Sequence, residues 1–225
     1  MGASLNGVIG SLSALLAALS FAAPGGVPVA HAAAPKRPPI RHNWIPYGPK
    51  RKSEMAAYAK RHYGVRTNKL VPKVIVEHWT QSTDTASVLS YFSHDVPDPE
   101  LHELPIVCSH YLIDTRGRIL QLVPLGLMCR HTVGLNDHAI GIEHVGMSDG
   151  GVMGNHAQLT ASIRLTRFLR CSFHIQIRDI IGHNESLKSR FHHERVRSLR
   201  NQTHEDMKTS TMRRYRQIVA RQSCG

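Results

Sequence analysis

The chain has 225 residues, with 28 Lys and Arg against 16 Asp and Glu, and so carries a formal net charge of +12. A charge this positive favours an anionic partner such as a cell-wall polymer. The basic residues are dispersed, without a zinc-finger, RNA-recognition or aromatic-basic pattern, so we expect no nucleic-acid partner. The four cysteines include no C-x-x-C pair, which argues against a thiolate zinc site and a thioredoxin-like motif.

Residues 1–32 are predicted to be a signal peptide. Residues 8–23 form an apolar run that is short for a membrane span, and Ala30-His31-Ala32 has the small-x-small pattern of a cleavage site. We therefore expect a secreted or cell wall-associated protein with no transmembrane segment after cleavage. In an oxidising compartment, disulfides are allowed and three pairings are open among the cysteines, which are Cys108, Cys129, Cys171 and Cys224.

The rest of the chain is predicted to be a Pro-rich basic arm, residues 33–52, followed by one domain, residues 53–225. Apolar periodicity and capping residues predict helices at 53–63, 84–92, 157–173, 189–200 and 210–222. Apolar runs predict strands at 73–78, 106–113, 118–123, 139–145 and 179–182, with a hairpin turn at 114–117. This interleaving predicts an α/β fold: a single domain with a central mixed β-sheet of about five to six strands, flanked by helices on both faces.

Chemically versatile side chains stand where these strands end. His78 closes the apolar run 73–78, and His183 follows Ile-Ile-Gly in the last predicted strand. The carboxyl ends of strands in an open sheet are where ligands gather. His131 and His204 lie in short polar turns, and Glu143 is a carboxylate inside an apolar strand, which is costly unless a site uses it.

Five ordered segments carry a family resemblance: EHWT, SHYLIDTRGRILQLVP, CRHTVGLN, AIGIEHVG and IIGHNES. In this order, over residues from about 70 to 215, the sequence resembles the zinc-dependent N-acetylmuramoyl-L-alanine amidases of the bacteriophage-lysozyme and peptidoglycan-recognition-protein type. The resemblance implies a groove over a zinc ion that receives the peptidoglycan stem peptide. We also expect a monomer.

The resemblance implies a zinc site with three protein ligands and one open position. His78 and His183 match the two histidine ligands. At the third position relatives carry Asp or Cys, and here His204 is preferred to Asp206 because the direct alignment places it at the ligand. The lysine that many relatives carry two residues earlier is then Gln202.

The resemblance also implies the other site residues. Glu143 matches the acidic residue that takes a proton from the attacking water and passes it to the leaving amine. His131 matches a histidine across the groove, and either donates to the oxyanion or holds the loop that contains Asn136. Thr80 and Asn136 are expected to bind substrate.

The sequence therefore predicts an exported zinc amidase that cleaves the amide between N-acetylmuramic acid and L-alanine of the stem peptide. The alternative is a non-hydrolytic peptidoglycan-binding module of the same fold. A third hypothesis is a basic nucleic-acid or membrane-surface binder that uses charge rather than metal. An intact third ligand together with Glu143 favours the enzyme, whereas the charge-based binder would lose affinity steeply with salt.

Overall fold

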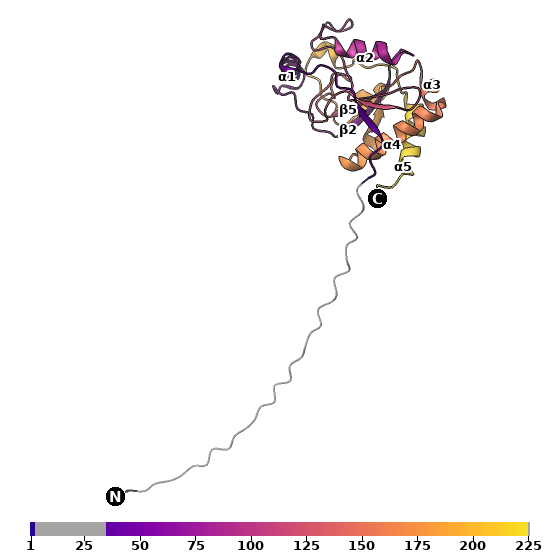
Figure 1. Cartoon of the computed structure of the whole chain (residues 1–225). Coiled ribbons are helices and arrows are strands. Elements are labelled where there is room, and N and C mark those ends of the chain that lie inside the picture. The colour runs from indigo at the N-terminus through magenta and orange to yellow at the C-terminus, as the bar shows by residue number, and fades with distance from the viewer. Residues whose placement is uncertain (3–34, 225) are drawn as a thin grey trace. The chain divides into compact units, whose positions relative to one another are not determined.

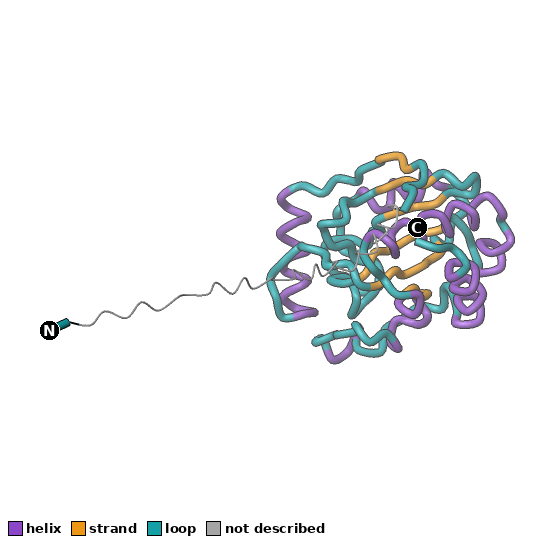
Figure 2. Tube along the Cα trace, turned by 90° about the horizontal axis from the view of Figure 1, so that it is seen from below, coloured by secondary structure: helices purple, strands orange, loops and turns teal. Residues whose placement is uncertain are grey.

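The computed structural model describes residues 1–2 and 35–224. The predicted signal peptide therefore lies outside the described residues, apart from Met1 and Gly2. Residues 35–224 form one compact unit, in which strands gather between helices (Figures 1 and 2). Within the described part of the chain, no helix has the length and apolar character needed to cross a membrane.

The centre of the domain is a mixed six-stranded sheet in the order β1-β4-β3-β5-β2-β6. Strands β3 and β4 form an antiparallel hairpin, and the other neighbouring strands are parallel. The predicted mixed α/β sheet is confirmed. The strands are β1 (Ile40–His42), β2 (Val74–Trp79), β3 (Tyr111–Ile113), β4 (Ile119–Gln121), β5 (Ala139–His144) and β6 (Ile180–Gly182).

Helices cover the two faces of this sheet, as the alternation of buried residues requires. The helices are α1 (Pro49–Tyr63), α2 (Thr85–Ser93), α3 (Asp149–Gly154), α4 (His156–Ser172) and α5 (Thr209–Ala220). Ile75 of β2 and Ile142 of β5 share a core with the buried residues of α4 and α5. Phe92 of α2 packs with Leu112 on the other face, where α1 also lies (Figure 1). The face that carries α1 and α2 also carries the candidate site.

Two predicted boundaries were wrong at the N-terminal side of the domain. The basic arm was expected to stay outside the core, but Ile40–His42 joins the sheet as β1, parallel to β4, and Asn43 N–H continues this pairing to the Gln121 carbonyl at 2.9 Å. Helix α1 begins at Pro49 rather than after Ser53. Proline suits the first helical position because its missing N–H would have no partner there.

The helix predicted at residues 189–200 is also wrong, since only Arg197–Leu199 forms a short 3₁₀ turn. Two backbone N–H groups of this segment bond to distant carbonyls instead. His193 N–H donates to Gly134 at 2.8 Å, and Arg195 N–H donates to His62 at 3.0 Å. A helix would have to give up these tertiary bonds, so packing overrides the local pattern.

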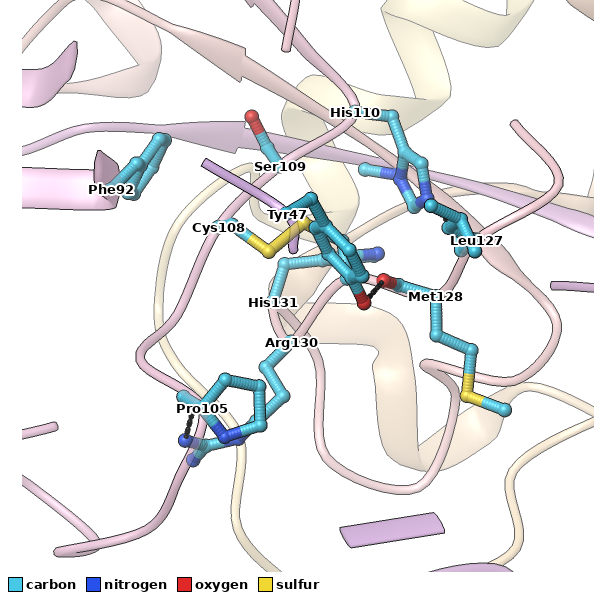
Figure 3. The surroundings of a disulfide bond; sticks show 12 residues. Tyr47, Phe92, Pro105, Cys108, Ser109, His110, Leu127, Met128, Arg130 and His131 are labelled. Atoms are coloured by element: carbon cyan, nitrogen blue, oxygen red, sulfur yellow. Dashed lines mark hydrogen bonds between the residues drawn. A yellow bond between two sulfur atoms is a disulfide. The ribbon is translucent and has the colours of Figure 1, made fainter. Parts of the chain in front are cut away.

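Disulfides join Cys108 to Cys129 and Cys171 to Cys224. The first links the segment before β3 to the segment that leads into His131, and Figure 3 shows Arg130 and His131 beside it. The Tyr47 hydroxyl donates a hydrogen bond to the Met128 carbonyl at 2.6 Å. One wall of the site is therefore held by a covalent bond and by hydrogen bonds to the N-terminal arm.

Candidate metal centre and active site

Three neighbouring parallel strands end at the site. His78 on β2 lies in register with Glu143 on β5, and Glu77 lies in register with Gly182 on β6. The next residue after Gly182 is His183, which therefore lies level with His78, on the side of β2 opposite to β5. Because side chains alternate along a strand, His78, Glu143 and His183 point to one face of the sheet. This is the arrangement that the predicted strand ends implied.

Asp206 completes a buried cluster with the two histidines. Its Oδ2 lies 3.1 Å from His78 Nδ1, and its Oδ1 lies 3.2 Å from His183 Nδ1. One donor atom from each of the three residues lies within 4.8 Å of the others. The structure thus places Asp206, not the preferred His204, beside the two histidines.

The loop that carries Asp206 is held from both ends. The Met207 carbonyl passes so close to Gly182 that a Cβ there would overlap it. Asn184 N–H donates to the Asp206 carbonyl at 3.0 Å. Asp149, at the start of α3, accepts hydrogen bonds of 2.8 Å from the backbone N–H groups of Met207 and of Lys208. These bonds direct the Asp206 side chain inward.

Sequence reasoning missed Asp149. Its carboxylate also accepts hydrogen bonds from Trp79 Nε1 at 2.8 Å and from Thr211 Oγ1 at 2.6 Å. Trp79 immediately follows the ligand candidate His78, so one carboxylate braces both sides of the cluster. The only local signal was an Asp in the first turn of a short helix, which ordinarily indicates a helix start.

His204 lies beside the cluster but is not part of it, because its Nε2 is engaged by Glu100 and Gln202, so the preferred third ligand needs correction. Its side chain is 39% exposed, and its Nε2 lies 3.1 Å from a Glu100 carboxylate oxygen. The same nitrogen lies 3.0 Å from Gln202 Nε2. The ring remains near His183, at 4.6 Å between centroids. Of the side chains of His204 and Asp206, only that of Asp206 is buried.

His131 lies behind His78 rather than across the groove. Its Nδ1 is 3.1 Å from His78 Nε2, and its Nε2 is 3.2 Å from the Ala139 carbonyl. The ring packs over Gly141, where a Cβ would come within 2.7 Å of it. Thr132 Oγ1 also lies 2.9 Å from Nδ1. Both ring nitrogens are therefore engaged by the protein, which disfavours the predicted oxyanion role.

Asn136 has surroundings unlike those expected of a substrate contact, whereas Thr80 lies at the surface of a hollow. Asn136 is buried, and its side-chain oxygen accepts from the backbone N–H groups of His131 at 2.9 Å and Thr132 at 2.8 Å, while its amide donates to Tyr58 Oη at 3.1 Å. It therefore holds the loop. Thr80 is half-buried, donates to the Ser82 carbonyl at 3.0 Å, and lines a surface hollow.

The charge states follow from burial and contacts. Burial opposes ionisation of Asp206, but hydrogen bonds with His183 and His78 outweigh it and lower the pKa of this carboxyl. Burial lowers the pKa of His183 to about 4, so this ring is neutral. Burial also lowers the pKa of His78, but the hydrogen bond to Asp206 and the charge of Glu143 raise it above its usual value. Asp206 is therefore an anion, which is the form in which a carboxyl group binds a metal.

Glu143, like the buried Glu77 one residue before His78, has a pKa that burial raises to about 7. For Glu143, the nearby His78 opposes this rise in pKa. The Oε2 atom of Glu143 is buried and has no hydrogen-bond partner among the described residues. A carboxylate in this state, beside a ligand cluster, is suited to accept and return a proton.

Two hollows lie beside the cluster. The larger, of about 1060 Å³, is lined by Trp79, Thr80, residues of α2, Glu143 and His204. The smaller, of about 330 Å³, is lined by Tyr58, His131, His183 and His204 among others. His204 belongs to both. Glu143 lines the larger hollow and His183 lines the smaller.

The fold and this site define an α/β protein with a candidate metal centre at the carboxyl ends of its parallel strands. The profile of the N-acetylmuramoyl-L-alanine amidase family matches residues 67–206. This match spans more than half of the chain and contains every residue of the cluster. The chain belongs to the N-acetylmuramoyl-L-alanine amidase family, and its function is that of a peptidoglycan amidase.

Solved structures support the fold. A mutant endolysin from Bacillus subtilis is 17% identical, with 80% of this chain and 98% of that one covered and a TM-score of 0.51. The catalytic domain of XlyA is 17% identical, with 80% of this chain and 99% of that one covered and a TM-score of 0.51. Among curated proteins, no sequence matches this chain significantly.

Proposed function

We propose that this protein hydrolyses the amide between N-acetylmuramic acid and L-alanine of the peptidoglycan stem peptide, with zinc bound by His78, His183 and Asp206. The observation that carries this proposal is the cluster itself. Two histidines from adjacent strands and one carboxylate from a distant loop bring their donor atoms within 4.8 Å of one another. The family match includes all of them.

The donor set fits zinc. Two imidazole nitrogens and one carboxylate are a common catalytic zinc environment, and they leave a fourth position for water or substrate. The lowered pKa of Asp206 keeps its carboxylate charged, and the low pKa of His183 keeps its ring neutral. When bound, zinc would polarise the scissile carbonyl and lower the pKa of the attacking water.

Glu143 is the proposed general base and acid. It lies in register with His78, and its pKa of about 7 leaves both protonation states populated at neutral pH. Its carboxylate would take a proton from the attacking water and deliver it to the nitrogen of the leaving L-alanine. Its unpartnered Oε2 is available for this transfer.

His131 is proposed to set the tautomer of His78. The Nε2–H of His131 donates to the Ala139 carbonyl, so its Nδ1 has a free lone pair. We propose that this lone pair accepts the Nε2–H of His78 at 3.1 Å, with the Thr132 hydroxyl at 2.9 Å as the neighbour that competes for it. The Nδ1 of His78, which points at Asp206, is then the atom that binds a metal once its proton leaves. Such outer contacts orient ligands and strengthen metal binding.

His204 acquires a different role once Asp206 is the third ligand. The residue two positions before the ligand is then His204, where many members of the family carry lysine. Its half-exposed ring lies beside His183 and lines both hollows. We propose that its ring N–H donates a hydrogen bond to the carbonyl oxygen of the substrate.

We also propose that the protein is exported, acts on the cell wall and functions as a monomer. The support for export is the apolar run and cleavage pattern within residues 1–32. The pairing of all four cysteines as disulfides suits an oxidising compartment.

The test is zinc content and hydrolysis of a muramoyl dipeptide, measured on the same preparations. His78→Ala and His183→Ala should each lose bound zinc and amide hydrolysis together. Glu205→Gln, at a highly exposed position of the loop, is the matched control and should change neither. Full zinc content and full hydrolysis in the His78 variant would contradict the proposed centre.

A further inference from the structure

A second charged feature lies on α4, away from the face that carries the metal cluster. Three stretches, residues 35–48, 150–178 and 207–224, contain no Asp or Glu, although the protein has 16 such residues. They supply the N-terminal arm with β1, helix α4 and helix α5. The fold brings the three together, because α4 packs against α5 and the arm lies beside α4.

A surface hollow of about 920 Å³ lies where the arm meets α4. Its charged lining residues are Lys36, Arg37, Arg164 and Arg167, and it has no acidic lining residue among the described part of the chain. Arg167 donates to the Ser223 carbonyl at 2.5 Å, and Arg37 contacts His42 at 3.4 Å. Neither partner is a carboxylate, so these contacts leave the positive charge uncompensated.

Other arginines of the protein do pair with carboxylates, which shows that the hollow differs from the rest of the described surface. The arginines with such partners are Arg51, Arg61, Arg118, Arg130, Arg190 and Arg216. On α5 the exposed Arg213 and Arg214 extend the basic surface. Positive charge is therefore also present on α5, the helix that packs against α4.

We propose that this basic face, defined by Lys36, Arg37, Arg164 and Arg167, binds a linear phosphodiester polymer of the cell wall. Guanidinium groups match phosphate oxygens in two-pronged hydrogen bonds, and three of the four cations are arginines. An open hollow, with the further cations Arg213 and Arg214 on α5, suits a chain of repeating phosphates better than one small anion. The choice of a wall polymer rests on the proposed function.

The surroundings distinguish this polymer from other polyanions. No aromatic side chain lines the hollow, and proteins that bind single-stranded nucleic acids stack bases on such side chains. No large exposed apolar residue lies on α4 or α5 or lines the hollow, and Trp44 is the one such residue in the described N-terminal stretch 35–48. Helices that bind membranes insert apolar side chains, so a lipid surface fits less well.

The position of this face relative to the active site is compatible with simultaneous binding. Helices α4 and α5 pack on the face of the sheet that carries Ile75, whereas His78 and Glu143 point to the opposite face. A polymer on the basic face would hold the enzyme at the wall without covering the cluster.

The experiment compares Arg164→Gln/Arg167→Gln with a control of equal charge, Lys52→Gln/Arg66→Gln, at exposed positions outside both sites. Binding to poly(glycerol phosphate) is measured over a range of salt concentrations. We expect the first variant to bind at least about tenfold more weakly at low salt. Its slope of log affinity against log salt should fall by about 1.4, since each phosphate contact on a flexible strand contributes about 0.7.

Three results would overturn the proposal. Equal weakening in the control would show that net charge alone is responsible. The other two are tighter binding to oligothymidylate of the same phosphate number, or to anionic lipid vesicles, than to poly(glycerol phosphate). Hydrolysis of a soluble muramoyl dipeptide should be unchanged in the Arg164/Arg167 variant, which verifies its fold. Polymer binding without any hydrolysis by the unmodified protein would refute the proposed activity but leave the basic face in place.

Discussion

Glu143→Gln should slow catalysis and stabilise the metal-free protein at the same time. Burial raises the pKa of Glu143 from 4.5 to about 7. The folded state therefore favours the protonated form: the contribution of this group to stability is largest below pH 4.5 and is lost as the pH rises through 7. At pH 8 the buried charge costs at most about 3 kcal/mol, since each pKa unit corresponds to about 1.4 kcal/mol.

Glutamine keeps the shape of the side chain without the charge, so the gain in stability should depend on pH. In denaturant unfolding of chelator-treated protein, we expect the variant to be up to about 3 kcal/mol more stable at pH 8 and nearly unchanged at pH 4. Chelation matters because a bound cation would itself stabilise the carboxylate. Turnover with zinc should fall by roughly two to four orders of magnitude, the usual share of general acid–base catalysis.

Glu205→Gln is the control for this comparison, because that side chain is 84% exposed and its removal should leave stability and turnover nearly unchanged. A Glu143 variant with the same stability difference at both pH values would refute the inferred burial of charge. Near-normal turnover would refute its catalytic role.

The remaining predictions concern the ligands and the residues that position them. Asp206→Ala should lose zinc as fully as a histidine-ligand variant, whereas His204→Ala should stay loaded and show mainly reduced turnover; the reverse pattern in metal analysis would contradict the geometry. His131→Ala should weaken zinc affinity by about ten- to a hundredfold in a chelator competition, since His78 loses the acceptor that sets its tautomer; unchanged affinity would reject this positioning role. Asp149→Ala should weaken zinc affinity because it frees the backbone after Asp206. Asp149→Asn keeps part of the hydrogen bonding and should weaken zinc affinity less. Equal zinc affinities in both variants and the unmodified protein would show that Asp149 is not needed to hold the loop.

Local sequence patterns were enough to predict the parts of the site that stand on strands. The apolar runs before His78 and His183 predicted buried strands. The apolar context of Glu143 indicated that a functional site uses its carboxylate. Parallel strands then require these ends to meet at one edge of the sheet, and the observed register places them there. For these residues, periodicity carries the positional information because strand geometry is regular.

The loop residues needed the tertiary structure. His204 and Asp206 stand two residues apart in a segment without periodicity, so either was a reasonable ligand from the sequence. The choice depends on bonds to partners far away in the chain, namely Gly182 with its missing side chain, Asn184 and Asp149. No pattern within the loop contains that information.

What the sequence by itself determined is the α/β class, the amidase resemblance, and the two histidines and the glutamate on strands. What only the tertiary structure decided is the third ligand, the place of His131 behind His78, and the gathering of three stretches free of acidic residues on one face. The physical reason is that a strand directs its side chains through its own repeat. A loop directs them through hydrogen bonds and close packing with residues far apart in sequence, and these contacts exist only once the chain has folded.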